Sequence, residues 1–554
     1  MTSTQVPLAG PPEHVFPTLT AAQMSRIEAH GRIRAIAPGD VLMDQGDPAV
    51  SFFVVRAGEL QTVRFLASAE TLVSVTGPGQ FTGEVNLLVG RPALFRVRVS
   101  AAGEVIELDR KSLLALVQTD AELGEIIMRA FIWRRVGLVR ARIGDVVLLG
   151  SLHSRDTLRI KEFLTRNGYP HNYLDLDRDP SAQPFLDAFH IVAGEVPVVI
   201  CRGQAALRNP SNREIAECLG FNESIDPTQI RDLVIVGAGP AGLASAVYGA
   251  SEGLDVLVLE TSSPGGQAGS SSRIENYLGF PTGVSGQELA ARAYTQAEKF
   301  GAQMLIATST RLRCDREPYL VETSEGASVP ARSIVIATGV QYRRLPLPNL
   351  AEFECAGIYY GATRVEQQLC DGEEVAVVGG ANSAGQAAIF LAQASKLVHI
   401  LIRADGLAAS MSRYLVRRIE ETPNIVLHPH TEIVALHGGE HLESVTWKSN
   451  VTEESEERKI RHVFVMTGGV PNTSWLEGCL ALDAKGFVKT GPELSPEDLS
   501  AAHWPLLRAP YLFETSLPRV FAVGDVRSDS LKRVASAVGE GSVAISFVHQ
   551  VMHD

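Results

Sequence analysis

The sequence predicts a multidomain protein in which a β-barrel or jelly roll with helices precedes an α/β unit and two three-layer α/β domains. Three observations predict this order. Short apolar runs separated by turns fill the first quarter of the chain, strand and helix patterns then alternate, and a strand–glycine turn–helix–strand pattern occurs twice further on. We expect domains at 1–140 and 145–225, a third domain formed by 230–343 and 474–554, and a fourth inserted at 344–473.

Composition limits the class of protein. The chain has 554 residues, of which 45% are hydrophobic, so it can bury several cores. No apolar run approaches the ~20 residues that cross a bilayer, and the N-terminus lacks a charged-then-apolar signal pattern. We therefore expect a cytoplasmic protein without a membrane partner. The net charge of -13 argues against a nucleic-acid partner.

The six cysteines are scattered, with no CxxC pair and no nearby histidine. We therefore expect neither a disulfide framework nor a zinc site, and interpret each cysteine as a small buried hydrophobe. They are Cys201, Cys218, Cys314, Cys355, Cys370 and Cys479.

A dinucleotide-binding pattern runs from Asp232 to Glu260. A short apolar strand is followed by glycines at GxGxxG spacing, then by a helix of small residues and a second apolar run. The glycines allow the tight turn, the approach of a pyrophosphate and close helix packing, while the terminal acid binds a ribose hydroxyl. The predicted cofactor-binding residues are Gly237, Gly239, Pro240, Ala241, Gly242 and Glu260.

Residues 1–140 begin with a helical piece after Thr18 and continue as short strands, with a helix-forming segment from Lys111 to Arg142. Turns are expected at Pro38–Asp40, Gly46-Asp47, Ala57–Glu59 and Gly77–Gly79. Short strands followed by helices indicate a small barrel or jelly roll.

The stretches Ala37–Leu42 and Phe53–Glu59 resemble the cyclic-nucleotide-binding domain family. In that family a Gly-Glu pair holds the ribose, and an arginine about nine residues later pairs with the cyclic phosphate. Gly83-Glu84 match the pair, whereas Ala93 stands at the arginine position, between Arg91 and Arg96. Two alternatives follow: the domain binds a cyclic nucleotide through Glu84, or it is a degenerate copy used for contact or regulation.

Residues 145–225 alternate between strand and helix patterns, with a hairpin after Pro197, which suggests a thioredoxin-like unit. The region also resembles the glutaredoxin family, in which Val196-Pro197 is the cis-proline. That family needs a cysteine at the start of the first helix, and Ser151–Thr157 contains none. We expect a module that docks partners without dithiol chemistry.

Five further motifs resemble those of the low-molecular-weight thioredoxin reductase family over residues 230–554. They are Pro264–Gln267, Ile274–Pro281, Ile336–Gly339, Phe521–Asp525 and Val534–Gly541. The resemblance implies bound FAD and a homodimer. It adds Gly266, Gln267, Asn276, Thr338, Gly339, Gly524, Asp525, Arg533 and Val534 to the flavin-binding residues.

A second nucleotide unit begins with a strand, turn and helix start at Glu374–Ala384, and its next strand closes on Arg403. A basic residue at that point favours NADPH, with NADH as the alternative donor. Ala381 replaces the middle glycine and Ala404 a second family arginine, so Arg413, Arg417 and Arg418 are alternative partners of the 2'-phosphate. The predicted binding residues are Gly379, Gly380, Asn382, Ser383 and Arg403.

The family carries a Cys-Ala-Thr-Cys sequence before the second nucleotide strand, and here Gly361 and Arg364 stand where the two thiols belong. We therefore predict that NADPH reduces FAD and that the electrons pass to a non-dithiol acceptor, either a small molecule or a protein. Arg364, facing the flavin, is the candidate catalytic residue. The alternatives are a disulfide reductase using Cys355, Cys370 or a partner's thiols, and a nucleotide-responsive sensor or scaffold with little turnover.

Overall fold

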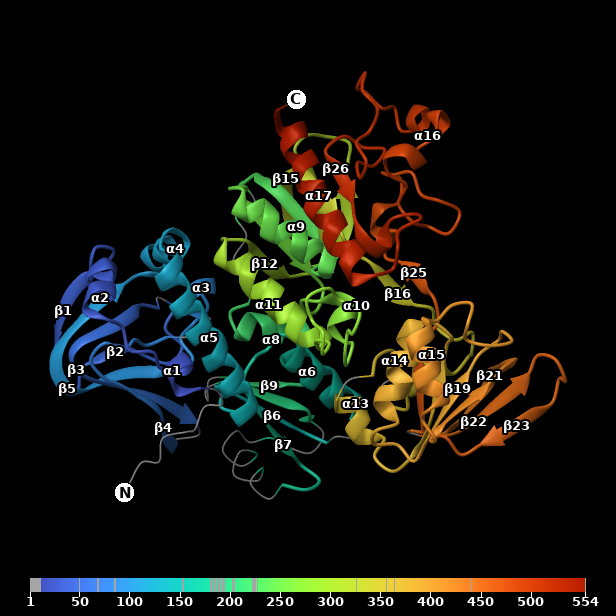
Figure 1. Cartoon of the computed structure of the whole chain (residues 1–554), viewed down its shortest axis with the longest axis horizontal. Helices are drawn as coiled ribbons and strands as arrows, with labels where there is room; N and C mark the ends of the chain where they lie inside the picture. Colours follow the sequence, from blue (N-terminus) through green and yellow to red (C-terminus); the bar gives the residue numbers. More distant parts are fainter. Residues whose placement is uncertain are drawn as a thin grey trace. The chain divides into compact units, whose positions relative to one another are not determined.

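The computed structural model divides the chain into two compact units (Figure 1). The first contains Met1–Ser224 with Thr295–Ile306, and the second Ile225–Tyr294 with Ala307–Asp554. Among the helices that the structure describes, none combines the length and the apolar composition needed to span a bilayer. The described residues are 11–553 except 49, 67–68, 84–85, 152–153, 180–181, 183–185, 187–190, 192–194, 202–204, 222–225, 227, 325, 355, 363 and 440, and of 66, 69, 89, 364, 365 and 553 only the backbone is described.

The first unit opens with an antiparallel sheet and several helices (Figure 1). The strands, in the order β1-β5-β3-β4 with β2 on β5, are β1 (Arg32–Ile36), β2 (Val41–Met43), β3 (Phe52–Leu66), β4 (Ala69–Thr76) and β5 (Arg96–Leu108). The helices are α1 (Pro12–Val15), α2 (Ala21–Glu28), α3 (Asn86–Val89), α4 (Arg110–Thr119) and α5 (Ala121–Ala141). Phe131 of α5 meets Phe52 and Phe81 at ring distances of 6.2 and 6.3 Å, which anchors α5 in the core.

Capping residues set the helix boundaries in this region. Thr20 caps α2 reciprocally with Gln23, so the helix predicted after Thr18 is present. The segment predicted to be helical from Lys111 to Arg142 is divided at Asp120, because its carboxylate accepts the N–H of Leu123 and starts α5 anew.

The turn predicted at Ala57–Glu59 was wrong. These residues lie inside the 15-residue strand β3, where the pairing with β5 shifts register on both sides of Ala57. Gly58 has φ +88°, and a Cβ there would approach the carbonyl oxygen of Ala101 at 2.5 Å. Gly58 therefore marks a β-bulge within one long strand. In the sequence, a glycine at a bulge looks the same as a glycine in a turn between two short strands.

The remaining part of the first unit has a four-stranded sheet in the order β7-β6-β8-β9. Its strands are β6 (Val146–Gly150), β7 (His171–Asp175), β8 (Val198–Cys201) and β9 (Ala205–Arg208), and its helices are α6 (Arg155–Arg166) and α8 (Asn212–Cys218). β6 and β7 are parallel, whereas β8 and β9 form an antiparallel hairpin. The predicted cis bond between Val196 and Pro197 is present. Ser154 caps the N-terminus of α6, in the stretch Ser151–Thr157 where the glutaredoxin family carries a cysteine and this chain has none. Residues 152–153 of that stretch lie outside the described residues.

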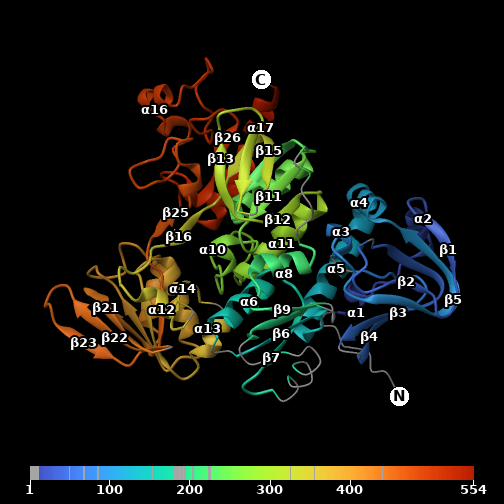
Figure 2. The same cartoon turned by 180° about the vertical axis from the view of Figure 1, so that it is seen from behind.

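The second unit is built on a sheet with the order β11-β10-β15-β14-β13 and with β26 beside β15 (Figure 2). The strands are β10 (Arg231–Val236), β11 (Val256–Glu260), β13 (Ser309–Arg313), β14 (Tyr319–Thr323), β15 (Ser328–Ile336) and β26 (Val520–Ala522). The helices include α9 (Pro240–Ser251), α10 (Gly266–Gly269), α16 (Pro496–Ala501) and α17 (Val534–His553). The last turn of α11 (Gly286–Lys299) and β12 (Gln303–Ile306) group with the first unit.

Two connecting strands, β16 (Val340–Tyr342) and β25 (Gly469–Pro471), pair antiparallel and enclose an inserted region. Its parallel sheet has the order β17-β24-β18-β19-β20 and contains β17 (Ile358–Tyr359), β18 (Glu374–Val378), β19 (Leu397–Leu401), β20 (Ile425–His428) and β24 (His462–Val465). β21 (Thr431–Gly438), β22 (Leu442–Ser449) and β23 (Ser455–Arg458) form a separate sheet. The helices are α12 (Leu350–Phe353), α13 (Arg364–Leu369), α14 (Asn382–Leu391) and α15 (Arg413–Glu420).

The expectation of no disulfides was wrong. Cys314 is bonded to Cys479, 165 residues away, and Cys201 at the end of β8 is bonded to Cys218 at the end of α8. Neither pair has a recognisable spacing, because the fold rather than the local sequence brings the two sulfurs together. Of the remaining cysteines, Cys370 is a free buried thiol and Cys355 lies outside the described residues.

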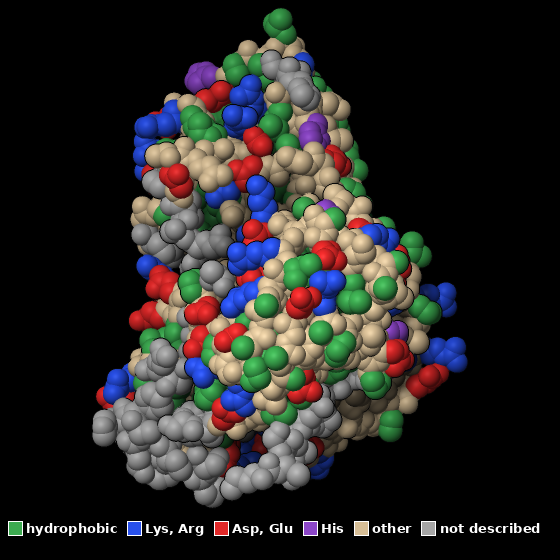
Figure 3. Space-filling model, turned by 90° about the vertical axis from the view of Figure 1, so that its left-hand side faces the viewer, with side chains coloured by type: hydrophobic (Ala, Val, Ile, Leu, Met, Phe, Trp, Pro, Cys, Tyr) green, Lys and Arg blue, Asp and Glu red, His purple; other side chains and the backbone are tan. Residues whose placement is uncertain are grey.

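Acidic and basic side chains are intermingled over the face that Figure 3 presents. Surface ion pairs of the first unit, such as Arg26–Glu122 and Arg56–Glu104, follow the same pattern. Exposed pairs of this kind contribute little to stability, typically about 0–1 kcal/mol each.

Candidate functional site

The turn between β10 and α9 is held so tightly that glycine is required at two positions. A Cβ on Gly237, which has φ +103°, would lie 2.4 Å from the carbonyl oxygen of Ala337 at the end of β15. A Cβ on Gly242 would lie 1.9 Å from the carbonyl oxygen of Gly237. The turn, the neighbouring strand end and the helix therefore touch through backbone atoms alone.

Gly239 is different, because no described residue other than its chain neighbours comes within 4 Å of its Cβ position. It is the N-cap of α9, and no side chain satisfies the helix N-terminus there. Pro240 occupies the first turn, where the missing N–H costs nothing. Open space beside the free N–H groups of a twelve-residue helix is the arrangement that accommodates a pyrophosphate.

A second glycine turn closes on the first. The N–H of Gly265 donates to the carbonyl of Ala238 at 2.7 Å, and the Cβ position of Gly266 is 3.1 Å from the Cα of Gly239. The Gln267 amide donates to the carbonyl of Val340 on β16 at 2.5 Å. The predicted residues of this motif are thus brought to the open side of the first turn.

Glu260 ends β11 beside the same turn. Its carboxylate accepts the N–H of Ala238 at 2.8 Å and that of Ser262 at 3.0 Å. A carboxylate has about four acceptor positions, so it retains capacity for a ribose hydroxyl. The geometry fits the role predicted for this residue.

The C-terminal segment returns to the turn through β26 and α17. A Cβ on Gly541 would lie 2.2 Å from the carbonyl oxygen of Ala241, and Ser245 donates its hydroxyl to the carbonyl of Gly541 at 3.0 Å. Gly524, with φ +73°, lies against Ala241, the Cβ-to-Cβ distance being 3.0 Å. Two helices far apart in sequence therefore cover one side of the site (Figure 1).

Asp525 follows Gly524 and is partly buried, and desolvation raises the pKa of its carboxyl group. Lys532 donates to the backbone carbonyl of Asp525 at 2.6 Å, and burial lowers the pKa of Lys532. No hydrogen bond from the described residues reaches the Asp525 carboxylate. A partly buried acceptor without a protein donor fits a ligand rich in hydroxyl groups.

Sequence reasoning missed the support of the Gly524 turn. Glu540 accepts the N–H of Gly524 at 2.6 Å, and its other oxygen accepts from Arg527 at 3.1 Å. Arg527 also donates to Glu493 at 2.8 Å. Glu540 belongs to the motif Val534–Gly541 and could have been singled out from the sequence. Arg527, 13 residues earlier, belongs to no motif and could not.

The remaining residues predicted to bind flavin do not all lie at the glycine turns. Thr338 donates to the carbonyl of Asn472, and the Asn472 amide donates back to Thr338, so Thr338 and Gly339 lie at the junction with β25. Asn276 and Arg533 are exposed, and no described hydrogen bond joins either to the glycine turns. Val534 is the first residue of α17. Taken together, the residues around both turns fit FAD, whose pyrophosphate, ribose and ribityl groups match these donors and acceptors.

The turn between β18 and α14 repeats the first in outline. A Cβ on Gly379, which has φ +142°, would lie 2.4 Å from the carbonyl oxygen of Met466. Ala381 is the exposed N-cap of α14 and makes no side-chain cap. The N–H of Ser412 donates to the Asn382 side chain at 2.8 Å, and Ser410 donates to the carbonyl of Gly380 at 2.8 Å. Sequence reasoning did not identify these two serines.

Arg403 is exposed just beyond β19, and among the described residues only its backbone carbonyl is hydrogen-bonded, by Asn450. Of the alternative arginines, Arg418 donates to both oxygens of Glu275 at 2.9 Å, and Arg417 pairs with Glu421. Arg413, the first residue of α15, is exposed and, like Arg403, has no side-chain partner among the described residues. The guanidinium groups of Arg403 and Arg413 are therefore both available for a 2'-phosphate, and the site fits a phosphorylated dinucleotide.

Tyr342 lies on β16. Burial raises the pKa of its phenol, an effect reduced by a hydrogen bond with Ser383 and increased by the charge of the Asp525 carboxylate. Ser383 is the second residue of α14, whereas Asp525 belongs to the flavin turn, so groups from both turns influence this phenol. No motif in the sequence indicated a role for Tyr342.

Gly361 lies between β17 and α13, and Arg364 begins α13. The Cβ position of Gly361 is 3.6 Å from the side chain of Ser270, which ends α10, the helix that begins at Gly266. Arg364 is the first residue of α13, and its side chain lies outside the described part. The segment that replaces the dithiol thus lies beside the flavin turn.

The remaining predicted residue, Glu84, lies outside the described residues. Gly83, next to it, has φ +101°, and its carbonyl accepts a hydrogen bond from Arg134 of α5 at 2.8 Å.

Comparison with known proteins agrees with this geometry. The family model for pyridine nucleotide-disulphide oxidoreductase matches residues 231–541, and the model for the cyclic nucleotide-binding domain matches residues 33–120. NADPH-dependent thioredoxin reductase 3 of Arabidopsis thaliana is 33% identical over 57% of this chain, and the match spans 57% of that relative's length. Thioredoxin reductase of Ureaplasma parvum is 30% identical over 58% of this chain and 97% of its own.

Two solved structures are similar in fold. Lactococcus lactis thioredoxin reductase in its FR conformation has a TM-score of 0.52 with 27% identity, covering 58% of this chain and 98% of its own. The structure of T. acidophilum thioredoxin reductase has a TM-score of 0.51 with 27% identity, covering 58% of this chain and 99% of its own. With more than half of its length matched, this chain belongs to the pyridine nucleotide-disulphide oxidoreductase family and is a thioredoxin reductase-like flavoprotein oxidoreductase with a cyclic nucleotide-binding domain.

Proposed function

We propose that this oxidoreductase takes electrons from NADPH through FAD and delivers them to an acceptor other than a cysteine pair of its own. The proposal rests on the segment from β17 to the start of α13, where the sequence resemblance implies that Gly361 and Arg364 stand in place of the family's two thiols, and where the described residues contain no cysteine pair. Family members use FAD and NADPH, and FAD when bound accepts hydride from the nicotinamide and holds the electrons for the acceptor.

The residues of this chain bind the two dinucleotides and align them with each other. The open N-terminus of α9 stabilises pyrophosphate charge, Glu260 accepts a ribose hydroxyl, and Asp525 accepts hydroxyls of the ribityl side. The N-terminus of α14 and Arg403 bind the second dinucleotide. Tyr342, which groups from both turns influence, fixes the spacing between them and helps to exclude water. Arg364 faces the flavin in our proposal and stabilises negative charge that develops there.

The state of the other cysteines supports a sulfur-free path. Burial raises the pKa of the Cys370 thiol, so it stays protonated and is a poor nucleophile. The two disulfides, Cys201–Cys218 and Cys314–Cys479, lie outside the segment from β17 to α13 that is next to the flavin turn. Turnover with the chain's own thiols would need a thiolate that can exchange with the flavin and with a partner disulfide.

Comparing acceptors tests the proposal. NADPH oxidation should be rapid with ferricyanide or benzoquinone, whereas a thioredoxin disulfide or the aromatic disulfide DTNB should be reduced at no more than a few per cent of that rate. A disulfide acceptor that outpaces both small oxidants would support the disulfide reductase alternative. If the protein binds FAD tightly but consumes almost no NADPH with any of these acceptors, the result would support the sensor or scaffold alternative.

Removing Cys355 and Cys370 should leave turnover intact. We expect Cys355→Ala combined with Cys370→Ala to keep the ferricyanide rate within about twofold, because hydride transfer between the cofactors involves no thiol. Thermal denaturation of the variant separates lost activity from the modest cost of replacing a buried cysteine. A loss of a hundredfold or more in a folded, flavin-containing variant would contradict the proposal.

Arg403 should set the preference for NADPH. Arg403→Glu is expected to lower kcat/KM for NADPH about 10- to 100-fold, the equivalent of one charged hydrogen bond, and to leave NADH nearly unaffected. Lys459→Glu makes the same charge change at an exposed position of the inserted region and serves as the control. Equal losses with both nucleotides would show that Arg403 acts on folding rather than on the 2'-phosphate.

We also propose the division into domains at 1–140, 145–225, 230–343 with 474–554, and 344–473. The pairing order β7-β6-β8-β9 and the cis bond before Pro197 support a thioredoxin-like module that docks a partner. A protein or small-molecule acceptor, a homodimer and a cytoplasmic location complete the proposal. Equilibrium sedimentation tests the dimer.

A further inference from the structure

One partly buried arginine joins three parts of the second unit beside the flavin turn. Arg527 follows η5 (Gly524–Val526), the short helix that forms this turn. Its guanidinium lies between the carboxylates of Glu540 on α17 and Glu493 on η4 (Gly491–Glu493). The side chains of Arg527, Glu540 and Glu493 are 15%, 12% and 24% exposed, so all three charges have limited access to water.

Glu540 connects Arg527 to the turn itself. One of its carboxylate oxygens accepts the N–H of Gly524 at 2.6 Å, and the other accepts a guanidinium N–H of Arg527 at 3.1 Å. The next residue of α17, Gly541, lies against α9, because a Cβ on it would be 2.2 Å from the carbonyl oxygen of Ala241. The position of the Glu540 carboxylate therefore sets the position of the Gly524 peptide relative to α9.

Glu493 holds the other side of the guanidinium. It accepts a hydrogen bond from Arg527 at 2.8 Å, and its second oxygen accepts the N–H of Thr490 at 3.4 Å. The N–H of Gly491 donates to the carbonyl of Glu514 at 2.9 Å, which ties η4 to the chain that leads into β26. The segment between β25 and β26 thus supports the flavin turn through Arg527.

The shape of the arginine side chain fits this place. Its Nε and Nη2 face Glu540, whereas Nη1 donates to Glu493 and, at 3.0 Å, to the carbonyl of Ser528. A planar guanidinium presents five N–H donors in a fixed arrangement, so one side chain holds both carboxylates at once. A carboxylate with limited access to water is costly without a cation, which makes the placement of Glu540 dependent on Arg527.

We infer that Arg527 is a positioning residue for FAD: it holds the Glu540 carboxylate on the Gly524 N–H and so fixes the direction of Asp525. The inference rests on the role proposed above for Asp525, whose carboxylate accepts hydroxyls of the ribityl side. No side-chain hydrogen bond from the described residues restrains that carboxylate, so its direction depends on the backbone of its own turn. Loosening the turn lowers FAD affinity, because a site that is no longer pre-organised must be ordered by the ligand.

Arg527→Met tests the inference, since it removes the cation and keeps an unbranched apolar stem. The dissociation constant of FAD is measured by fluorescence titration of the full chain after its flavin has been removed. We expect this constant to rise about 10- to 100-fold, as for one lost charged hydrogen bond. Unchanged FAD affinity would overturn the inference alone, whereas an unaltered protein that takes up no FAD would remove the proposed function together with it.

A second variant separates positioning from stability. Arg527→Met leaves two carboxylates without their cation, which destabilises the fold as well. Adding Glu493→Gln and Glu540→Leu removes these charges, so the thermal midpoint of the flavin-free protein should recover much of its loss. FAD affinity should stay at least about 10-fold below that of the unaltered protein, because no carboxylate holds the Gly524 N–H. FAD affinity that recovers together with the thermal midpoint would show that Arg527 acts on folding alone.

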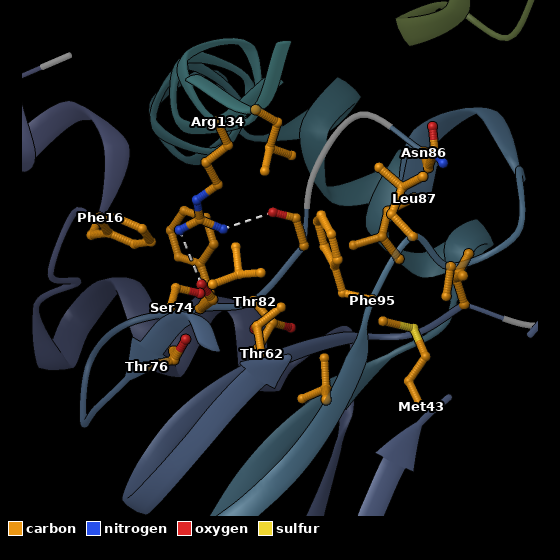
Figure 4. Close-up of a pocket in the computed structure, with 18 residues that line it drawn as sticks. Phe16, Met43, Thr62, Ser74, Thr76, Thr82, Asn86, Leu87, Phe95 and Arg134 are labelled. Atoms are coloured by element: carbon orange, nitrogen blue, oxygen red, sulfur yellow. Dashed lines mark hydrogen bonds between the residues drawn. The ribbon is translucent and has the colours of Figure 1, made fainter. Parts of the chain in front are cut away.

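Arg134 of the first unit is a matched control, because it also braces backbone. Its guanidinium donates to the carbonyls of Val15, Gly83 and Phe81 at 2.9, 2.8 and 3.1 Å. Figure 4 shows Arg134 reaching from α5, with Phe16 beside it. Arg134→Met should lower the thermal midpoint and leave FAD affinity within about twofold, since it makes no contact with the flavin turn.

Lys489 provides a control within the same segment as Glu493. Its ammonium group pairs with Asp498 at 2.9 Å and is also partly buried. Lys489→Met removes a cation there without touching Glu540, and FAD affinity should again stay within about twofold. A loss of FAD affinity in Lys489→Met or Arg134→Met as large as that in Arg527→Met would contradict a specific role for Arg527.

Discussion

Gly242→Ala should yield a folded protein that is purified without flavin. The added methyl group would lie 1.9 Å from the carbonyl oxygen of Gly237, so α9 must move away from β10. Such overpacking typically costs about 1–3 kcal/mol, and here the displaced element is the one that positions the pyrophosphate. We expect FAD affinity to fall about a hundredfold, as measured by the flavin-to-protein absorbance ratio and by fluorescence titration of released FAD.

Gly539→Ala is the matched control for this substitution. Gly539 lies on α17 at an exposed position, and no atom lies within 4 Å of its Cβ. Alanine there improves helix propensity and should leave the flavin content unchanged. If Gly242→Ala retains full flavin, the close approach of α9 to its strand does not determine binding and the account of the turn fails.

Gly379→Ala should separate the two cofactor sites. Its methyl group would lie 2.4 Å from the carbonyl oxygen of Met466, and φ +142° is a strained value for any other residue. We expect the protein to keep its yellow FAD, while the rate of flavin reduction at subsaturating NADPH falls at least about a hundredfold. Anaerobic stopped-flow absorbance at several NADPH concentrations measures the effect.

Gly439→Ala controls for the general cost of losing a glycine in the inserted region. Gly439 is exposed in the turn between β21 and β22, and its Cβ position is open. It should reduce flavin at the rate of the unaltered protein. Loss of FAD from Gly379→Ala would instead mean that the inserted region helps to hold the flavin, which the separate sheets do not suggest.

The glycine turns could be predicted from the sequence because their requirements are local. Gly237 and Gly242 are read directly from the spacing of a strand, a turn and a helix, and the contacts that exclude a side chain lie within the same unit. Glu260 follows from the same pattern. The cis bond at Val196-Pro197 was expected from the resemblance to the glutaredoxin family, whereas the cis bond at Glu317-Pro318 was not predicted, because no resemblance pointed to that proline.

Features that depend on long-range packing were missed. The Cys314–Cys479 bond joins residues 165 positions apart, and Arg527 reaches Glu540 and Glu493 only after β26 has paired with β15. Tyr342 comes under the influence of Asp525 and Ser383 through the connection between two sheets. Gly58 misled the prediction because a bulge and a turn require the same positive φ.

An anaerobic titration of the flavin with NADPH tests most directly the claim that FAD is reduced without help from sulfur. NADPH delivers one hydride, which carries the two electrons that FAD accepts. The account predicts that one equivalent of NADPH per FAD bleaches the flavin completely. A flavin that stays oxidised until a second equivalent is added would reveal a redox-active cysteine pair, and a flavin that NADPH never bleaches would remove the proposed oxidoreductase chemistry.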